Sequence, residues 1–401
     1  MVRPMRSLLS HLFVGSTLVG ALACAPGEPL PFAPASADAA PDPAEFGPYP
    51  VGVRTVTFID TLRVDEHTGE PRKLVTEIWY PAVEAAREGP FESYELYERI
   101  PDDLREGLTP EDLGTLPTRA VRDALPRQDE VSFPVVVFSH GKGGLREQST
   151  FFTVHLASHG YVVASPDHAG DTTVDLLREL VAEGDLQEDT VLEAMAERPD
   201  DVIALLDLMR DTLGNDPLHE LLDFERVGCT GHSFGAFTSL VTATLDHRID
   251  AVVAQTPTSH EVVQLQSSVL MSEMSKPVLV QSAGLDRTLP EDTNAESLVE
   301  QLPSGRTWWL SLNDAGHFTY SDLCVLDVEA IDAALEIDAS NTLTDGCGVE
   351  NIATELAFPA IRTSAIGFLN AQLRDSTGSM EFLSQSALDE VAPGTGTFSA
   401  K

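Results

Sequence analysis

Gly231-His232-Ser233-Phe234-Gly235 follows a short apolar stretch, residues 227–230, and precedes residues 236–241, which can continue as a helix. A Gly/Ser loop could carry the same pentapeptide, but a strand before it and a helix after it are typical of a nucleophile elbow. The turn is so tight that the serine takes a strained backbone conformation, and only glycine tolerates the crowding two residues to either side. We therefore predict that Ser233 is a nucleophile at a helix N-terminus, where developing negative charge is favoured.

The composition allows a sizeable core and a strongly acidic surface. The chain has 401 residues, of which 42% are hydrophobic, so it can form one large α/β domain or two smaller ones. Its formal net charge of −39 argues against nucleic acid and against polyanionic substrates as partners. A solvated, aggregation-resistant surface is the simplest meaning of this charge.

The first residues resemble an export signal. Two arginines precede a mostly apolar run, residues 8–23, which is too short and too interrupted for a spanning helix. Leu22-Ala23-Cys24-Ala25 is similar to a bacterial lipoprotein signal, in which the cysteine is acylated. We expect a signal peptide at 1–23, a lipid anchor on Cys24 in the cell envelope and a Pro/Ala-rich flexible tether at 24–48. Ordinary secretion into the periplasm or medium is the alternative.

Three further cysteines remain after Cys24. Cys324 and Cys347 lie in one C-terminal stretch, and export would permit a disulfide between them. Cys229 lies on the predicted elbow strand and is expected to be a small packed thiol.

Short apolar strands alternate with helical segments through most of residues 49–401. This alternation predicts an α/β fold, with a mainly parallel central sheet and helices on both faces. Residues 82–128 and 171–197 read as insertions, the second as a partial lid. The expected strands are an antiparallel pair at 51–60 and 73–80, followed by 133–138, 161–164, 227–230, 251–255, 278–281 and 307–312; two of the expected helices are 149–158 and 200–209.

A serine nucleophile needs a base, and the reacting groups of such sheets gather at the carboxyl ends of the strands. His247 precedes a predicted strand and therefore lies at the wrong end. His317 follows the 307–312 strand on a short loop and is the expected base. His260, a few residues beyond another strand, is not excluded by position.

Asp286 is the expected acid that orients the histidine. It ends the stretch directly beyond the 278–281 strand and precedes His317 by 31 residues, which gives the chain order Ser, Asp, His. Competing carboxylates are Asp314, Asp292 and Glu291. Asp314 is so near His317 in sequence that it could hardly orient the far ring nitrogen.

Two backbone N–H groups should form an oxyanion hole. One is assigned to Phe234, next to the nucleophile, and the other to Lys142, in the glycine-rich turn 139–144 after a strand. No cofactor is required. Asp167 and His168 are expected to form structural hydrogen bonds near the site rather than bind a metal, and Arg198 an ion pair or cap.

The combination of motifs resembles the α/β-hydrolases, and within them the dienelactone-hydrolase-like and platelet-activating-factor acetylhydrolase-like bacterial esterases. In the animal acetylhydrolases the acid follows the strand after the elbow, whereas Asp286 lies one strand later, as in dienelactone hydrolases and cutinase-like polyester hydrolases. The resemblance covers roughly residues 49–373. Its motifs are Glu77-Ile78-Trp79-Tyr80-Pro81-Ala82, Phe138-Ser139-His140-Gly141-Lys142-Gly143-Gly144, Ala164-Ser165-Pro166-Asp167-His168-Ala169-Gly170, Gly231 to Ala236, and Gly316-His317-Phe318.

This resemblance implies a serine carboxylesterase that works through an acyl-enzyme. Short-chain lipid or phospholipid acyl esters are candidate substrates, but the phospholipid acetyl group of the acetylhydrolases does not carry over. A cutinase-like polyester hydrolase is one alternative. A peptidase or acyltransferase with the same triad is another. An envelope lipoprotein that keeps the hydrolase fold as a non-catalytic binding module is the alternative from a different class.

Overall fold

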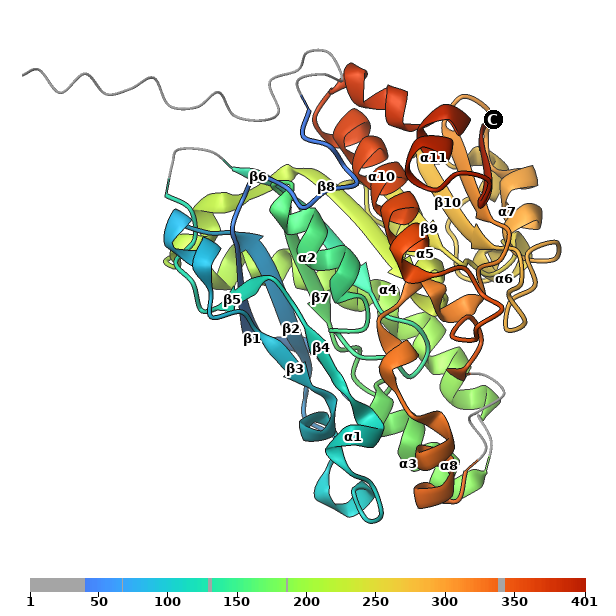
Figure 1. Cartoon of the computed structure of the whole chain (residues 1–401). Helices are drawn as coiled ribbons and strands as arrows, with labels where there is room; N and C mark the ends of the chain where they lie inside the picture. Colours follow the sequence, from blue (N-terminus) through green and yellow to red (C-terminus); the bar gives the residue numbers. More distant parts are fainter. Residues whose placement is uncertain (1–39, 67, 129–131, 185–186, 338–342) are drawn as a thin grey trace, which may run out of the picture. The chain divides into compact units, whose positions relative to one another are not determined.

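The computed structural model describes residues 40–66, 68–128, 132–184, 187–337 and 343–401. Most of its strands form one ten-stranded sheet in the order β12-β11-β10-β9-β8-β6-β7-β2-β1-β5 (Figure 1). In that order the strands are β12 Gly396–Ala400, β11 Thr307–Leu312, β10 Val278–Ala283, β9 Ile249–Gln255, β8 Leu222–His232, β6 Phe133–Ser139, β7 Val162–Pro166, β2 Pro71–Pro81, β1 Val51–Val64 and β5 Ala120–Arg122.

The middle of the sheet, from β11 to β7, is parallel throughout. β2 runs antiparallel to both β7 and β1, and β12 runs antiparallel to β11 at the other edge. The parallel strands are almost continuously apolar and buried, as expected when helices cover both faces. The predicted fold class and the predicted antiparallel pair at the start of the domain are confirmed.

Helices cover the two faces of the sheet (Figure 1). On one face, α2 and α10 contribute Phe152 and Phe368 to a buried apolar cluster. On the other, α4 and α5 contribute Leu205 and Phe237 to a second cluster. The longer helices are α2 Thr150–Ser158, α3 Thr173–Glu183, α4 Glu188–Thr212, α5 Phe234–Leu245, α8 Val328–Leu335 and α10 Thr354–Leu373; the shorter are α1 Pro110–Leu113, α6 His260–Gln264, α7 Ala295–Gln301 and α11 Gln385–Val391.

The two predicted insertions differ in structure. The second consists of α3 and the first half of α4, so the helix expected at 200–209 is much longer. The first contains short 3-10 turns, α1 and a small sheet of β3 Ser93–Glu95 and β4 Thr115–Pro117. It is not wholly outside the main sheet, because β5 pairs with β1. This pairing satisfies backbone groups at an edge that would otherwise be open.

Ordered contacts begin before residue 49, within the segment predicted to be a flexible tether. The backbone carbonyl of Pro43 accepts a hydrogen bond from a ring nitrogen of His155 in α2, and that of Glu45 accepts one from His159, the residue after this helix. The predicted signal peptide at 1–23 and residues 24–39 of the tether lie outside the described residues. Within the described residues, no helix is both long and apolar enough to cross a membrane.

The backbone is tightly crowded at the turn from β8 into α5. Ser233 occupies it with a φ of 56° and a ψ of −117°, a conformation that L-residues rarely adopt. A Cβ on Gly235 would stand 1.8 Å from the carbonyl oxygen of Ser139, and one on Gly231 would stand 2.4 Å from the backbone of Gly235. The glycines are therefore required by the approach of β6 to this turn.

Replacing Gly235 with alanine is expected to lower the free energy of unfolding by about 3 kcal/mol, because the added methyl group meets rigid backbone. Gly214→Ala is the matched control, since the nearest atom to its Cβ is 4.0 Å away. Urea unfolding of both variants measures the difference. Equal midpoints for the two would contradict the crowding argument.

Candidate active site

Four loops at the carboxyl ends of parallel strands form the site. Ser233 follows β8, the glycine-rich turn at 141–144 follows β6, Asp286 follows β10 and His317 follows β11. Ser233, His317 and Lys142 line one cavity. The structure thus brings together the residues that the sequence predicts for nucleophile, base and oxyanion hole.

His317 is oriented by the predicted acid. Its Nδ1 lies 2.8 Å from Oδ2 of Asp286, and both side chains are almost fully buried. The other oxygen, Oδ1, accepts a hydrogen bond of 2.6 Å from the backbone N–H of Leu289. With Nδ1–H donated to the carboxylate, the Nε2 of a neutral imidazole is left as a proton acceptor.

The competing candidates lie elsewhere. His260 bonds to Ser297 and does not line the cavity that contains Ser233. Glu291 accepts a hydrogen bond from Ser282, while Asp314 and Asp292 are exposed. None of these groups bonds to His317 within the described residues.

The glycine-rich turn lies directly against the elbow. A Cβ on Gly141 would be 3.7 Å from the Cβ of Ser233. Within the described part of the chain, the backbone N–H groups of Lys142 and Phe234 have no hydrogen-bond acceptor. Two free donors beside one hydroxyl are what an oxyanion hole needs.

A chain of hydrogen bonds connects the glycine-rich turn, the elbow and the loop of His317. The sequence analysis assigned no role to the side chains that form it. Gln148 accepts from the N–H of Gly141 at 3.0 Å and donates to Nδ1 of His232 at 2.8 Å. His232 in turn donates from Nε2 to the carbonyl of His317 at 2.9 Å. Burial holds the pKa of His232 well below its usual range, so the ring is neutral and serves as both donor and acceptor.

A buried ion pair lies against the glycine-rich turn at 141–144. Arg198, which has no exposed surface, lies 3.1 Å from Asp171, donates to the carbonyl of His140 and sits 4.9 Å from the ring centre of Phe234. Asp171 also accepts from the N–H of Gly143 at 3.0 Å. Burial lowers the pKa of Arg198 to about 10, which leaves it charged at neutral pH. The ion pair expected for Arg198 therefore contacts both segments that carry the predicted oxyanion donors, the glycine-rich turn and Phe234.

His168 and Asp167 form structural hydrogen bonds, as the sequence analysis expects. His168 lies 2.9 Å from Asp201 and 3.3 Å from the hydroxyl of Ser139, and burial lowers its pKa to about 3. Asp167 is paired with Arg146. In the described ranges, no group of three or more His, Cys, Asp or Glu side chains could hold a metal ion.

The structure describes three of the four cysteines. A disulfide joins Cys324 to Cys347, the pair expected from the sequence. Cys229 is a buried free thiol whose pKa is raised by burial. Cys24 lies outside the described residues.

Asp345, two residues before the disulfide, holds the acid and base loops together. Its Oδ2 accepts from the backbone N–H groups of Arg287 and Thr288 at 2.8 and 2.9 Å. Its carbonyl accepts from the N–H of Phe318 at 2.7 Å. Asp345 thus holds the residue after Asp286 through its buried carboxylate and the residue after His317 through its backbone carbonyl. The only sequence signal near it was the cysteine at 347.

We expect Asp345→Ala to lower kcat/KM on an ester substrate at least tenfold, because two backbone donors lose their acceptor and the Asp286 loop can shift. Asp345→Asn keeps one acceptor oxygen and should lose less. Asp292→Ala, in an exposed position of the same region, is the control. Steady-state kinetics with thermal melting of each variant separates a displaced site from an unfolded one; wild-type kinetics in folded Asp345→Ala would refute the role.

Two family models match parts of this chain. The model of "Platelet-activating factor acetylhydrolase, isoform II" matches residues 38–175, and that of "Dienelactone hydrolase family" matches residues 121–307. The platelet-activating factor acetylhydrolase of Canis lupus familiaris is 26% identical over 160 residues, which cover 32% of this chain and 36% of that protein.

Two streptomycete proteins are also similar. The bis(hydroxyethyl) terephthalate hydrolase of Streptomyces coelicolor is 29% identical over 189 residues, covering 47% of this chain and 51% of that protein. The chain thus spans between about a third and a half of the length of these curated relatives. The solved structure of a ferulic acid esterase from Streptomyces cinnamoneus superimposes with a TM-score of 0.60 at 24% identity, over 82% of this chain and 91% of that one. The chain has an α/β-hydrolase fold, and parts of it match the models of the platelet-activating factor acetylhydrolase and dienelactone hydrolase families.

Proposed function

We propose that this protein is a serine carboxylesterase that uses Ser233, His317 and Asp286. The observation that carries the proposal is the 2.8 Å contact between His317 Nδ1 and Asp286, made by a histidine that lines the same cavity as Ser233. The strained conformation of Ser233 at the start of α5 supports it, since strain of this kind concentrates at functional sites.

The reaction follows from the positions of these groups. Nε2 of His317 removes the proton of the Ser233 hydroxyl as its oxygen attacks the ester carbonyl. The backbone N–H groups of Lys142 and Phe234 donate to the oxyanion of the tetrahedral intermediate. His317 then gives its proton to the leaving alcohol, and a water molecule activated by the same imidazole releases the acid from the acyl-enzyme. Asp286 stabilises the imidazolium that forms in both halves of the reaction.

The relatives support an ester as substrate, since their names denote an acetylhydrolase, a bis(hydroxyethyl) terephthalate hydrolase and a ferulic acid esterase. The terephthalate hydrolase favours a second candidate, a cutinase-like hydrolase that acts on polyesters or their fragments. Both candidates use the same residues and differ only in the groups attached to the ester.

Ser233→Ala is expected to lower kcat on p-nitrophenyl esters by about five to six orders of magnitude, because the substitution removes the hydroxyl that forms the acyl-enzyme. Ser304→Ala, on the exposed surface, should keep wild-type turnover. A fluorophosphonate probe should label the wild type and not the Ser233 variant. If the folded wild type hydrolysed no ester and took no label, the alternative of a non-catalytic envelope binding protein would replace this proposal.

We further propose that the protein is exported and anchored to a membrane through a lipid on Cys24. The support is the sequence alone: an apolar run at 8–23 that ends in Leu22-Ala23-Cys24. Cys24→Ala should move the protein from the membrane fraction to the soluble fraction of a bacterial host, measured by fractionation and immunoblotting. An unchanged distribution would contradict the anchor.

A further inference from the structure

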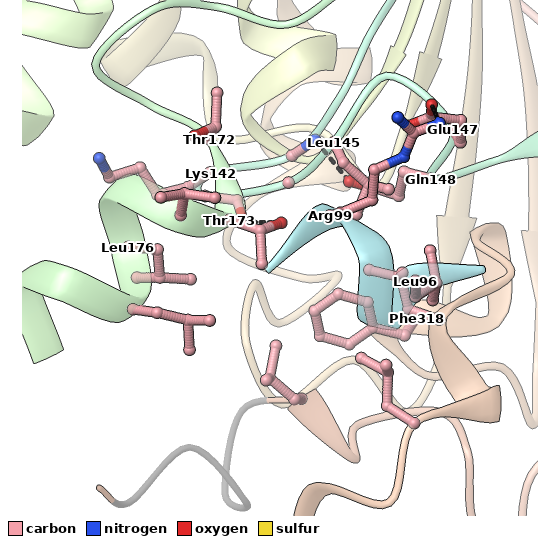
Figure 2. Close-up of a pocket in the computed structure, with 18 of the residues that line it drawn as sticks. Leu96, Arg99, Lys142, Leu145, Glu147, Gln148, Thr172, Thr173, Leu176 and Phe318 are labelled. Atoms are coloured by element: carbon pink, nitrogen blue, oxygen red, sulfur yellow. Dashed lines mark hydrogen bonds and ion pairs between the residues drawn. The ribbon is translucent and has the colours of Figure 1, made fainter. Parts of the chain in front are cut away.

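The cavity that contains Ser233 extends well beyond the reacting groups. Its volume is about 390 Å³. Besides the catalytic loops, three segments outside the parallel strands line it: the first insertion from η3, Leu96–Arg99, to α1; the helix α3; and the segment of η8, Leu323–Val325, and α8. Figure 2 shows Leu96 of η3 on one side of this space and Thr173 and Leu176 of α3 on the other, while the side chain of Arg99 points toward Glu147.

The walls contributed by these three segments are aliphatic. Their cavity-lining side chains are mainly leucine and isoleucine from all three segments, and six of them are Leu96, Ile100, Leu113, Leu177, Leu323 and Ile331. Each of the six belongs to the buried apolar residues of the molecule. A space of this size with such walls is suited to an apolar group, because water inside it would find few hydrogen-bond partners.

The charged side chains of the cavity are paired with one another or with a neighbour. Arg99 lies 2.6 Å from Glu147, and Lys142 lies 2.8 Å from Asp171. Arg146 is paired with Asp167. Among the described residues, the cavity therefore offers no unpaired charge to neutralise a charged substrate group, and burying such a group there would be costly.

The size of the cavity sets a lower limit on the group it accepts. An apolar cavity of ~150 Å³ is enough to hold benzene. A cavity of about 390 Å³ thus has room for roughly a dozen carbon atoms, shared between the two sides of the ester. An acetyl group would leave most of the leucine and isoleucine walls without contacts.

We propose that this cavity binds neutral esters through an aliphatic chain of about six to ten carbons, and that the wall formed by α1, α3 and α8 selects for it. The inference rests on the proposed esterase function, and it makes acetyl esters poor substrates. Each methylene that the wall removes from water raises kcat/KM by up to about fourfold until the cavity is full. The aliphatic chain that the cavity binds belongs either to the acyl group or to the alcohol of the ester. Two series of substrates distinguish these cases.

The test measures kcat/KM of the full-length protein on p-nitrophenyl acetate, butyrate, hexanoate, octanoate and decanoate, and on acetate esters of alcohols of matching lengths. One series should rise at least tenfold from its shortest member to its best. The p-nitrophenyl monoester of adipic acid matches hexanoate in chain length but ends in a carboxylate, and should react at least tenfold more slowly than hexanoate.

Wall variants complete the experiment. Leu113→Trp should lower the octanoate-to-acetate ratio of kcat/KM at least tenfold, because the indole fills part of the cavity; Leu177→Phe is the second variant in case the first does not fold. Leu265→Trp, at a position 69% exposed and outside the cavity, is the matched control and should keep the wild-type ratio.

The outcomes distinguish failure of the substrate assignment from failure of the proposed esterase function. The substrate assignment would be overturned if both series favoured acetate and the wall variants did not change this preference. The esterase function would still stand in that case if Ser233→Ala lost all hydrolysis. No hydrolysis of any ester by the folded wild type would overturn both. Equal rates on hexanoate and the adipate monoester would refute the selection for neutral groups.

Discussion

The approach of β6 to the turn between β8 and α5 constrains the rest of the site. Ser233 is held in its strained conformation because the backbone on both sides of it runs within contact distance of Ser139. The same approach puts the turn at 141–144 beside the serine, so the nucleophile and the free N–H groups share one side of the cavity. Removing the contact would separate groups that, in the proposed reaction, act on a single carbonyl.

Polar groups buried beneath the loops transmit this constraint to the other parts of the site. Gln148 and His232 connect the glycine-rich turn at 141–144 to the backbone of His317. Arg198 connects the same turn to Phe234. Asp345 makes the corresponding connection between the loops that follow β10 and β11. Such groups cost free energy to bury unless each is satisfied, so their hydrogen bonds specify one arrangement of the loops.

The segments that shape the cavity belong to a different part of the fold. The loops after the parallel strands carry the proposed reacting groups, whereas the first insertion, α3 and the chain around α8 supply the aliphatic walls. Asp327 N–H donates to the carbonyl of Asp112 at 2.8 Å, which ties α8 to the end of α1. Chemistry and substrate size can therefore change independently in this molecule, because different segments determine them.

Strands with a continuous apolar pattern were predictable from local sequence, because a strand buried on both faces must be apolar at every position. The expected strand at 307–312 has the bounds of β11, and Ser233, Asp286, His317, Lys142 and Phe234 lie where the order of strands and loops put them. β5 and β12 were not predicted, because each is short and is stabilised by pairing with a distant strand. The contacts of residues 43–45 were missed as well, since their partners are two distant histidines, one in α2 and one directly after it.

The sequence by itself determined the fold class, the elbow and the candidates for the reacting residues, because these depend on local patterns and on which end of a strand a loop follows. Only the tertiary structure decided which of the candidate acids contacts His317, that Asp345 supports both loops and that three remote segments enclose an aliphatic cavity. These features are contacts between residues far apart in the chain. Nothing in the local sequence around either partner encodes them.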